Sequence, residues 1–240
     1  MPVSKAEIAV ISPPPPDNLA GLAATDDGRR WLAALPGLIS ELTGDWELEL
    51  ERSCPGASVS YVALARRHGQ EVVLKIQWPH DECLHEADAL RAWDGSGAAR
   101  LLAHDPARHA LLLERCDPGT TLADSACGDT TAVVVELLPR LWIPAGAPFQ
   151  TLETEAARWR DGLYDDWREA GRPFERELLD LAARYLEELP GSQGEQVLVH
   201  QDLHGGNILA AVREPWLAID PKPLRGEREF ALAPLVLALT

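Results

Sequence analysis

The stretch VLVHQDLHGGNIL, which begins at Val197, places acidic, amide and imidazole side chains directly after an apolar run. Asp202 and Asn207 stand five residues apart, and two glycines between them allow a tight, non-helical loop. Asp220 follows a second short apolar run. Carboxylate and amide oxygens suit Mg²⁺, which keeps several waters and bridges substrate phosphates. We predict that Asn207 and Asp220 bind magnesium and that Asp202 accepts a proton from an attacking hydroxyl, as phosphoryl transfer requires.

The same stretch allows two other interpretations at this point. His200, Asp202 and His204 can act as loop caps and hydrogen-bonding groups of the core, without any chemistry. They can also belong to a zinc hydrolase, although the two glycines disfavour the helix that would place both imidazoles on one face. Stoichiometric zinc in the purified protein would distinguish the hydrolase.

A lysine and a glutamate in the N-terminal half complete a phosphate-binding pattern. Lys75 interrupts the apolar strand EVVLKIQW, where a lysine either lies at a sheet edge or reaches toward phosphates. Glu86 follows eleven residues later on a predicted helix and can pair with Lys75, although alone it reads equally well as an exposed helix charge. We predict that the two side chains form an ion pair.

Two weaker signals concern the nucleotide. The segment SCPGASVSYV between two predicted strands contains Gly56 and Ser58, and its backbone N–H groups could cover phosphates. An ordinary hairpin loop explains the segment nearly as well. The apolar strand ALLLERC ends where the chain changes character, and we predict that backbone groups of Glu114 to Cys116 meet an adenine edge.

The elements that position these residues come in the order strands first, helices afterwards, which predicts an α+β fold. Alternation and turn residues predict strands over residues 46–51, 59–65, 71–77, 100–103, 110–114, 197–199 and 216–219, of which the first three form an antiparallel meander. Apolar periodicity predicts helices over residues 18–43 (broken near 26–28 and at Pro36), 81–93, 120–141 and 151–189. We divide the chain into an N-terminal arm (1–17), an N-terminal nucleotide-binding lobe (18–116) and a C-terminal catalytic and substrate lobe (117–240).

Composition limits the partners. The formal charge of −16 over 240 residues makes nucleic acid a poor partner, because phosphate binding normally needs a basic face. A small cationic molecule is a better match, although solubility alone also explains the excess of carboxylates. The four cysteines show no C-x-x-C spacing, and the sequence has neither a secretory segment nor a run of about 18 apolar residues. We expect a cytoplasmic protein with no membrane partner, and the sequence does not indicate an oligomeric state.

With these residues assembled, the sequence resembles the aminoglycoside phosphotransferase superfamily. More narrowly, HEADALRAW, HQDLHGGNIL and AIDPKPLRGEREF resemble the streptomycin 6-kinase and hydroxyurea-resistance kinase family, over about Leu38 to Phe230. The resemblance implies a bilobal protein-kinase-like fold, with an N-terminal antiparallel sheet lobe and a C-terminal, mostly helical lobe. It also implies transfer of the γ-phosphate of ATP, with Mg²⁺, to a hydroxyl of a streptomycin-like aminoglycoside.

The resemblance also implies roles for single residues. Asp202 matches the catalytic base, and Asn207 and Asp220 match the metal ligands. Lys75 and Glu86 match the phosphate-binding lysine and its acidic partner, and Glu114 and Cys116 match the adenine-binding hinge. Streptomycin carries guanidinium groups, so its site should be acidic, and the candidates by location are Asp165, Asp166, Glu227 and Glu229.

Two features depart from the family pattern. Ala231 follows the GEREF segment where members of the family have Asp, and the chain stops at Thr240 where members usually continue. The C-terminal lobe is therefore expected to be shortened. If Thr240 is the natural end of the chain, part of the substrate wall is missing, and activity is weak, altered or lost while ATP binding survives. The alternatives are a kinase of another small alcohol or sugar and a nucleotide-binding pseudokinase.

Overall fold

The structure is a computed structural model that describes residues 17–237. The predicted arm, residues 1–17, lies outside the described residues except for Asp17. The chain forms two compact units, one of residues 1–81 and 100–115 and the other of residues 82–99 and 116–240, and each is described by itself. The sequence assigned residues 18–116 to one lobe, whereas the structure groups residues 82–99 with the second unit.

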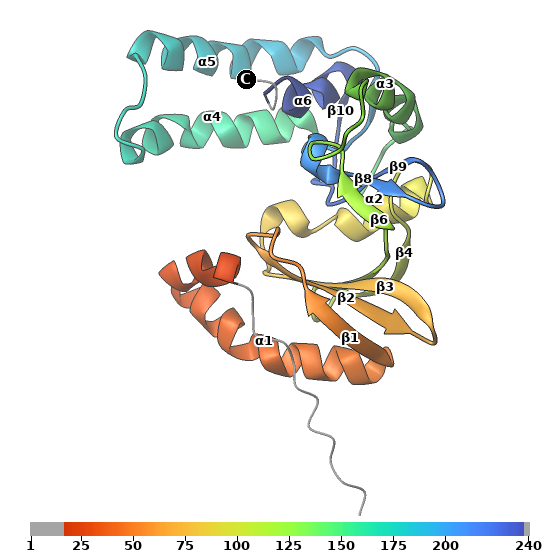
Figure 1. Cartoon of the computed structure of the whole chain (residues 1–240). Helices are drawn as coiled ribbons and strands as arrows, with labels where there is room; N and C mark the ends of the chain where they lie inside the picture. The colour runs from red at the N-terminus through yellow and green to blue at the C-terminus, as the bar shows by residue number, and fades with distance from the viewer. Residues whose placement is uncertain (1–16, 238–240) are drawn as a thin grey trace, which may run out of the picture. The chain divides into compact units, whose positions relative to one another are not determined.

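The first unit is built on a five-stranded antiparallel sheet in the order β1-β2-β3-β5-β4 (Figure 1). Its elements are η1 (Asp17–Ala24), α1 (Asp26–Asp45), β1 (Leu48–Ser53), β2 (Ser60–Arg67), β3 (Gln70–Gln77), β4 (Leu101–Asp105) and β5 (Ala110–Glu114). The predicted meander is therefore confirmed. Its central hairpin turns through His68 and Gly69, both at positive φ, as a tight two-residue turn requires.

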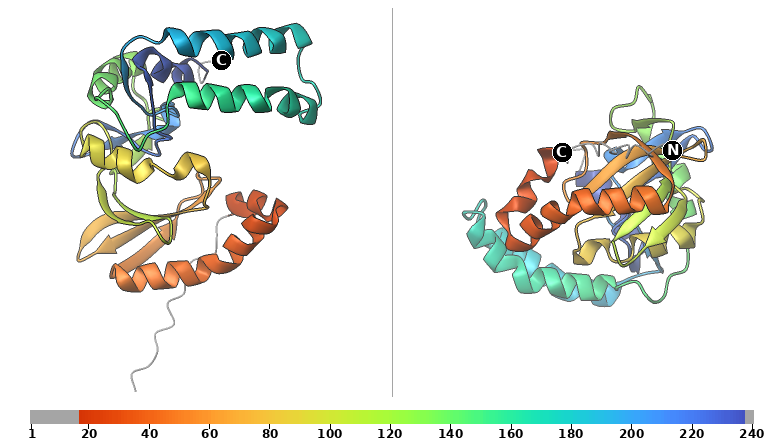
Figure 2. Two further views of the ribbon diagram at one scale, coloured as in Figure 1. Left: turned by 180° about the vertical axis from the view of Figure 1, so that it is seen from behind. Right: turned by 90° about the horizontal axis from the view of Figure 1, so that it is seen from below.

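Helix α1 covers one face of this sheet (Figure 1, Figure 2). The side chains on its buried stripe, Trp31, Leu35, Ile39 and Leu42, pack in one core with alternate residues of β2, β3 and β5. The prediction that Pro36 ends the helix is wrong, since α1 runs through it. Pro36 is on the exposed side of the helix, where water can bind the carbonyl group that lacks an N–H partner, while burial of the opposite stripe holds the helix together.

The second unit combines short strands with helices. Its elements are η2 (Asp81–Cys83), α2 (Glu86–Trp93), β6 (Pro118–Thr121), α3 (Thr130–Leu141), α4 (Leu152–Glu169), α5 (Arg176–Glu188), η3 (Leu189–Ser192), β7 (Gln196–Val199), η4 (Gly205–Asn207), β8 (Ile208–Ala211), β9 (Trp216–Ala218), β10 (Leu224–Glu227), η5 (Arg228–Leu232) and α6 (Ala233–Leu237). The predicted helix from residue 120 was wrong at its start, where β6 pairs with β8. Strands β8 and β10 were also missed, because each has only four residues and gains its partners from distant segments.

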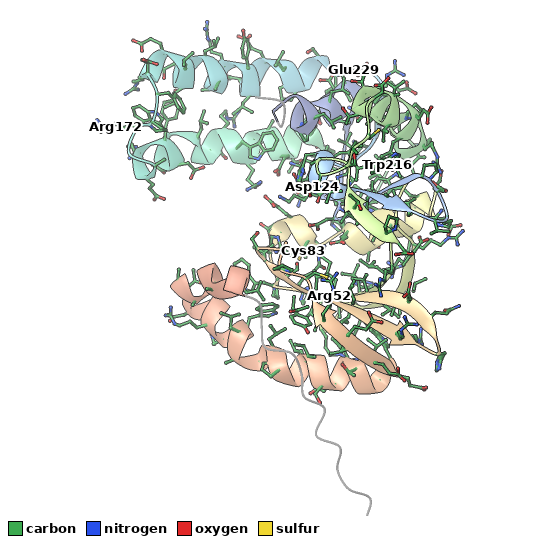
Figure 3. The ribbon with its side chains drawn as sticks, viewed as in Figure 1. Arg52, Cys83, Asp124, Arg172, Trp216 and Glu229 are labelled. Atoms are coloured by element: carbon green, nitrogen blue, oxygen red, sulfur yellow. The ribbon has the colours of Figure 1, made fainter. Side chains whose placement is uncertain are left out.

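Two small sheets and a helical hairpin organise this unit. Strand β7 pairs with β10, and β8 lies between β6 and β9. Helices α4 and α5 lie side by side, joined by the turn that contains Arg172 (Figure 3). Among the helices of residues 17–237, none is long and apolar enough to cross a membrane.

Candidate active site

The loop after β7 folds back on its own backbone. The N–H of Asp202 donates to the carbonyl of His200 at 2.8 Å, and the N–H of His204 donates to the carbonyl of Asp202 at 3.1 Å. The N–H of Asn207 then donates to the carbonyl of His204 at 2.9 Å. Gln201 has a φ of 63°, a strained value for a non-glycine residue, which reverses the chain just before Asp202.

The glycine pair in this loop allows a close contact. The Gly205 carbonyl accepts a hydrogen bond from the N–H of Ala123 at 3.1 Å. A Cβ atom on Gly205 would lie 3.2 Å from both the Cβ and the backbone nitrogen of Ala123. The sequence predicted conformational freedom at this pair, but neither glycine has a positive φ. A side chain on Gly205 would therefore require the segment after β6 to move by a few tenths of an ångström.

Hydrogen bonds hold Asp202 and Asn207 in one loop and join this loop to the residue before Asp220, whereas the roles of the three side chains stay predictions. The Asn207 side-chain amide donates a hydrogen bond to the backbone carbonyl of Asp202 at 2.9 Å. This bond directs Nδ2 to the loop, so Oδ1 is the atom that would bind the predicted magnesium ion. The backbone carbonyl of Asn207 accepts a hydrogen bond from the N–H of Ile219 at 3.0 Å, and Asp220 is the residue that follows Ile219. One carboxylate and one amide oxygen, completed by water and phosphate, fit the way Mg²⁺ binds in nucleotide enzymes.

His200 is a structural residue. Its side chain is almost completely buried, its ring stacks on Trp93 with centroids 6.0 Å apart, and its Nε2 lies 2.9 Å from the Ile219 carbonyl. Burial lowers the pKa of His200 to about 4, so the ring is neutral and donates from Nε2. This bond ties the loop before Asp202 to the strand end before Asp220.

The zinc interpretation is therefore wrong. His200 uses Nε2 inside the core, and His204 Nδ1 accepts a hydrogen bond from the N–H of Gly206 at 3.0 Å. No group of three or more His, Cys, Asp or Glu side chains in the part of the chain that the structure describes could hold a metal ion.

Lys222 is a residue that the sequence analysis missed. Its Nζ lies 3.3 Å from Oδ2 of Asp202 and 3.1 Å from Oε2 of Glu82. Burial lowers the pKa of Lys222, but the two carboxylates outweigh this effect and raise the pKa above its ordinary value. The available signal was the motif DPKP, in which a lysine stands two residues after Asp220 between two prolines.

Glu155 is a second missed residue. It is buried in the first turn of α4, and its Oε1 accepts a hydrogen bond from the Gln201 side chain at 3.4 Å. The Arg158 guanidinium, 2.5 Å away, lowers the pKa of Glu155 against the opposing effect of burial. Glu155 thus supports the strained residue that precedes Asp202.

The predicted nucleotide-binding residues of the first unit occupy the sheet. Lys75 is buried on β3 and alternates with Leu74 and Ile76, so its side chain points to the face opposite α1. Ser58 is exposed in the turn between β1 and β2. Glu114 ends β5, and its carboxylate accepts from the N–H of Arg100 at 3.0 Å. The ATP contacts of all three residues stay predictions.

Glu86 and Cys116 belong to the second unit. Glu86 is the first residue of α2 and is almost completely buried, which for a carboxylate requires a hydrogen-bonding or charged partner. Cys116 follows directly on the point where the chain passes from the first unit to the second. The ion pair of Glu86 with Lys75 and the hinge role of Cys116 stay predictions.

The four acidic candidates for the substrate lie in separate places. Asp165 and Asp166 are exposed near the end of α4, where Asp165 pairs with Arg168. The carboxylate of Glu227 accepts from the N–H of Gly194 at 3.3 Å. Glu229 in η5 is exposed and accepts from Arg228 at 3.2 Å, at the opposite end of the α4–α5 pair from Arg172 (Figure 3).

The first turn of α4 contacts the residue before Asp202. Glu155 touches Gln201 there, and Asp165 follows ten residues later. At a rise of about 1.5 Å per residue, Asp165 lies roughly 15 Å farther along the helix axis. The role of Asp165 and Asp166 at the guanidinium groups of an acceptor stays a prediction.

Together, the sheet unit, the helical unit and the loop with Asp202, Asn207 and Asp220 define a protein-kinase-like phosphotransferase. The model of the aminoglycoside/hydroxyurea antibiotic resistance kinase family matches residues 45–239. The chain belongs to this family.

Named relatives agree. The chain is 40% identical over 212 residues to the streptomycin 6-kinase of Streptomyces glaucescens, covering 87% of this chain and 69% of the relative. It is 39% identical over 215 residues to the hydroxyurea phosphotransferase of Kitasatospora aureofaciens, covering 88% of this chain and 63% of the relative.

Solved structures support the fold. An aminoglycoside phosphotransferase crystallised with ADP and hygromycin B superimposes with a TM-score of 0.57 at 16% identity, over 81% of this chain and 74% of that one. A choline/ethanolamine kinase family protein from Mesorhizobium loti gives a TM-score of 0.55 at 19% identity, over 89% and 70% of the two chains. The predicted protein-kinase-like fold class is confirmed.

Proposed function

We propose that the protein transfers the γ-phosphoryl group of ATP, with Mg²⁺, to a hydroxyl of a streptomycin-like aminoglycoside. The observation that supports the proposal is the hydrogen bonding that joins the loop of Asp202 and Asn207 to the strand end before Asp220, because these are the residues to which we assign the proton acceptor and the two oxygen ligands. Relatives named streptomycin 6-kinase match 87% and 91% of the chain, which supports streptomycin as the first acceptor to test.

The chemistry follows from the positions of these groups. The acceptor oxygen forms a bond to the γ-phosphorus while the bond to the bridging oxygen breaks, and ADP leaves with that electron pair. Asp202 orients the hydroxyl and takes its proton. Asn207 and Asp220 hold magnesium, whose charge offsets the charge of the phosphates. Lys75 is proposed to bind the phosphates of ATP as a further cation.

Charge supports a cationic acceptor. The chain carries a formal charge of −16, and Glu82 and Glu155 stand close to the loop of Asp202. Glu82 forms an ion pair with Lys222, which also pairs with Asp202, and Glu155 accepts a hydrogen bond from Gln201. A molecule with guanidinium groups gains favourable interactions with such surroundings, whereas an anionic acceptor would be repelled.

The test measures ADP release from ATP and Mg²⁺ with and without streptomycin, and identifies the phosphorylated product by mass. We expect streptomycin-dependent release, and a fall in kcat of about 10³-fold or more in Asp202→Ala, since the general base is lost. The affinity of the variant for ATP, measured by calorimetry, should stay within about threefold of the wild type because Asp202 acts on the acceptor.

Other outcomes have distinct meanings. ADP release with hydroxyurea or choline, but not with streptomycin, would identify a different acceptor and leave the proposed phosphotransferase activity in place. ATP binding without release over all these acceptors would indicate a nucleotide-binding protein without transfer. A strong loss of ATP affinity in Asp202→Ala would contradict the role of this carboxylate.

A further inference from the structure

Within the active-site loop, we infer that Lys222 is the positioning residue of Asp202: held by Glu82, its ammonium group fixes one carboxylate oxygen and leaves the other for the acceptor. This inference rests on the proposed function, because it assigns a partner to the proton acceptor. Lys222 contacts Oδ2 of Asp202 at 3.3 Å. Oδ1 of Asp202 lies 3.9 Å from His204 Nε2, a distance longer than a hydrogen bond. Oδ1 therefore stays available for a hydroxyl.

The backbone of Lys222 is built into the loop. Its N–H donates to the carbonyl of His200 at 3.0 Å, and the N–H of Asp202 donates to the same carbonyl at 2.8 Å. One acceptor thus holds both segments, so the two side chains start next to each other. A chance contact between two surface side chains would not have this shared anchor.

The flanking prolines restrict Lys222 further. Pro221 and Pro223 are both buried, and each ring fixes its own φ near −65°. A proline also restricts the residue before it to extended backbone conformations, which applies to Lys222 because Pro223 follows. The backbone that carries the Lys222 side chain therefore has few alternative conformations.

Glu82 holds the ammonium group from the other side, at 3.1 Å. Lys222 and Glu82 are both partly exposed, with 37% and 43% of their side chains accessible. Ion pairs of this exposure contribute little to stability, so a purely structural role would leave few measurable effects. Precise orientation of a reacting group has a much larger effect on rate than such a pair has on folding.

The experiment compares Lys222→Met with Lys222→Arg and Glu82→Gln in the full-length protein. We expect Lys222→Met to lower kcat about 100-fold, with the KM for ATP within about threefold and Tm within about 2 °C of the wild type. Lys222→Arg keeps the cation and should retain about a tenth or more of kcat, and Glu82→Gln should lose about tenfold.

Arg176→Met is the matched control, since it removes one exposed cation that pairs with Asp180 on α5 and changes the net charge equally. Its kcat should equal that of the wild type. A kcat of Lys222→Met close to that of the control would overturn the inference, as would an equal loss in Lys222→Arg.

A crystal structure separates failure of this inference from failure of the proposed function. If the wild type phosphorylates no acceptor, the proposed function fails, and the structures of wild type and Lys222→Met still decide the positioning role. The inference requires the Asp202 carboxylate to keep one orientation in the wild type and to change it or become disordered in the variant. An unchanged carboxylate in the variant would exclude it.

Discussion

At the residue scale, the backbone is strained at two positions of the candidate site: at Gln201, directly before the candidate base, and at Asp220, a predicted metal ligand. Gln201 and Asp220 have φ values of 63° and 56°, each of which costs about 1–3 kcal/mol in a non-glycine residue. His200 offsets this cost, because its Nε2 bonds to the Ile219 carbonyl and its own carbonyl holds the N–H of Asp202. His200 thus helps to hold both strained residues in place, through its imidazole beside Asp220 and its backbone carbonyl beside Gln201.

Stability should therefore depend on the charge of His200. Its pKa is lowered from 6.5 to about 4 in the folded protein, so between these values the unfolded chain binds a proton that the folded chain does not. The contribution of neutral His200 to the free energy of unfolding is fully present above pH 6.5. It is lost as the pH decreases toward 4, which lowers the free energy of unfolding by up to about 3 kcal/mol. Urea unfolding of the metal-free and nucleotide-free protein at several pH values measures this loss.

His200→Gln isolates this contribution from that of the carboxylates. The glutamine can donate a hydrogen bond but does not titrate, so its unfolding free energy should change less between pH 6.5 and 4 than that of the wild type. Identical pH slopes in the two proteins would show that His200 is not the titrating group.

Lys75 should act on ATP and not on the acceptor. Its buried ammonium group lies on the sheet face opposite α1, and no other lysine lies on these five strands. Lys75→Met should weaken ATP affinity about tenfold or more and lower kcat, since phosphate binding and orientation are both affected. Calorimetry with ATP and steady-state kinetics measure the two effects, and an unchanged KM for ATP would contradict the assignment.

The sequence was informative where residue type and local spacing carry the chemistry. Asp202 and Asn207 share one loop, and Asp220 follows the next strand pair, so the roles predicted for them depend on a short stretch of chain. Glu155 could not be found in this way, and for Lys222 the motif DPKP marked the residue but not its partners. Their partners, Glu82 and Gln201, are far from them in the sequence and meet them only through the fold.

At the element scale, packing overrode local propensity in both directions. Helix α1 continues through Pro36 because one stripe of the helix is buried on the sheet. Strand β6, in contrast, lies where apolar periodicity predicted a helix, and it exists because β8 supplies its hydrogen bonds. Neither result depends on neighbours within the same segment, so a pattern read over ten residues could not contain it.

Gly226 joins two elements of the second unit. A Cβ atom there would lie 2.9 Å from the Cβ of Leu152 at the start of α4, and the neighbouring N–H of Arg225 donates to the Gln150 carbonyl at 2.7 Å. Gly226→Ala should destabilise the protein by about 1–3 kcal/mol, because β10 and α4 must separate.

Gly194→Ala is the matched control, since nothing lies within 4 Å of an added Cβ at that position. Thermal unfolding of both variants measures the difference. If the two variants unfolded at the same temperature, the close approach of β10 to α4 would not be a constraint on the fold.

At the scale of the whole molecule, the formal charge of −16 acts on both substrates with opposite sign. It attracts a cationic acceptor and repels the anionic ATP, and added salt screens both interactions over a Debye length of about 10 Å at 0.1 M. We expect the KM for streptomycin to rise several-fold between about 20 mM and 300 mM salt, while the KM for ATP stays level or falls. The two substrates are thus controls for each other in one series of measurements, because a general effect of salt on the enzyme would move both KM values together. A KM for streptomycin that does not respond to salt would mean that neutral contacts select the acceptor, and that the excess of carboxylates serves solubility.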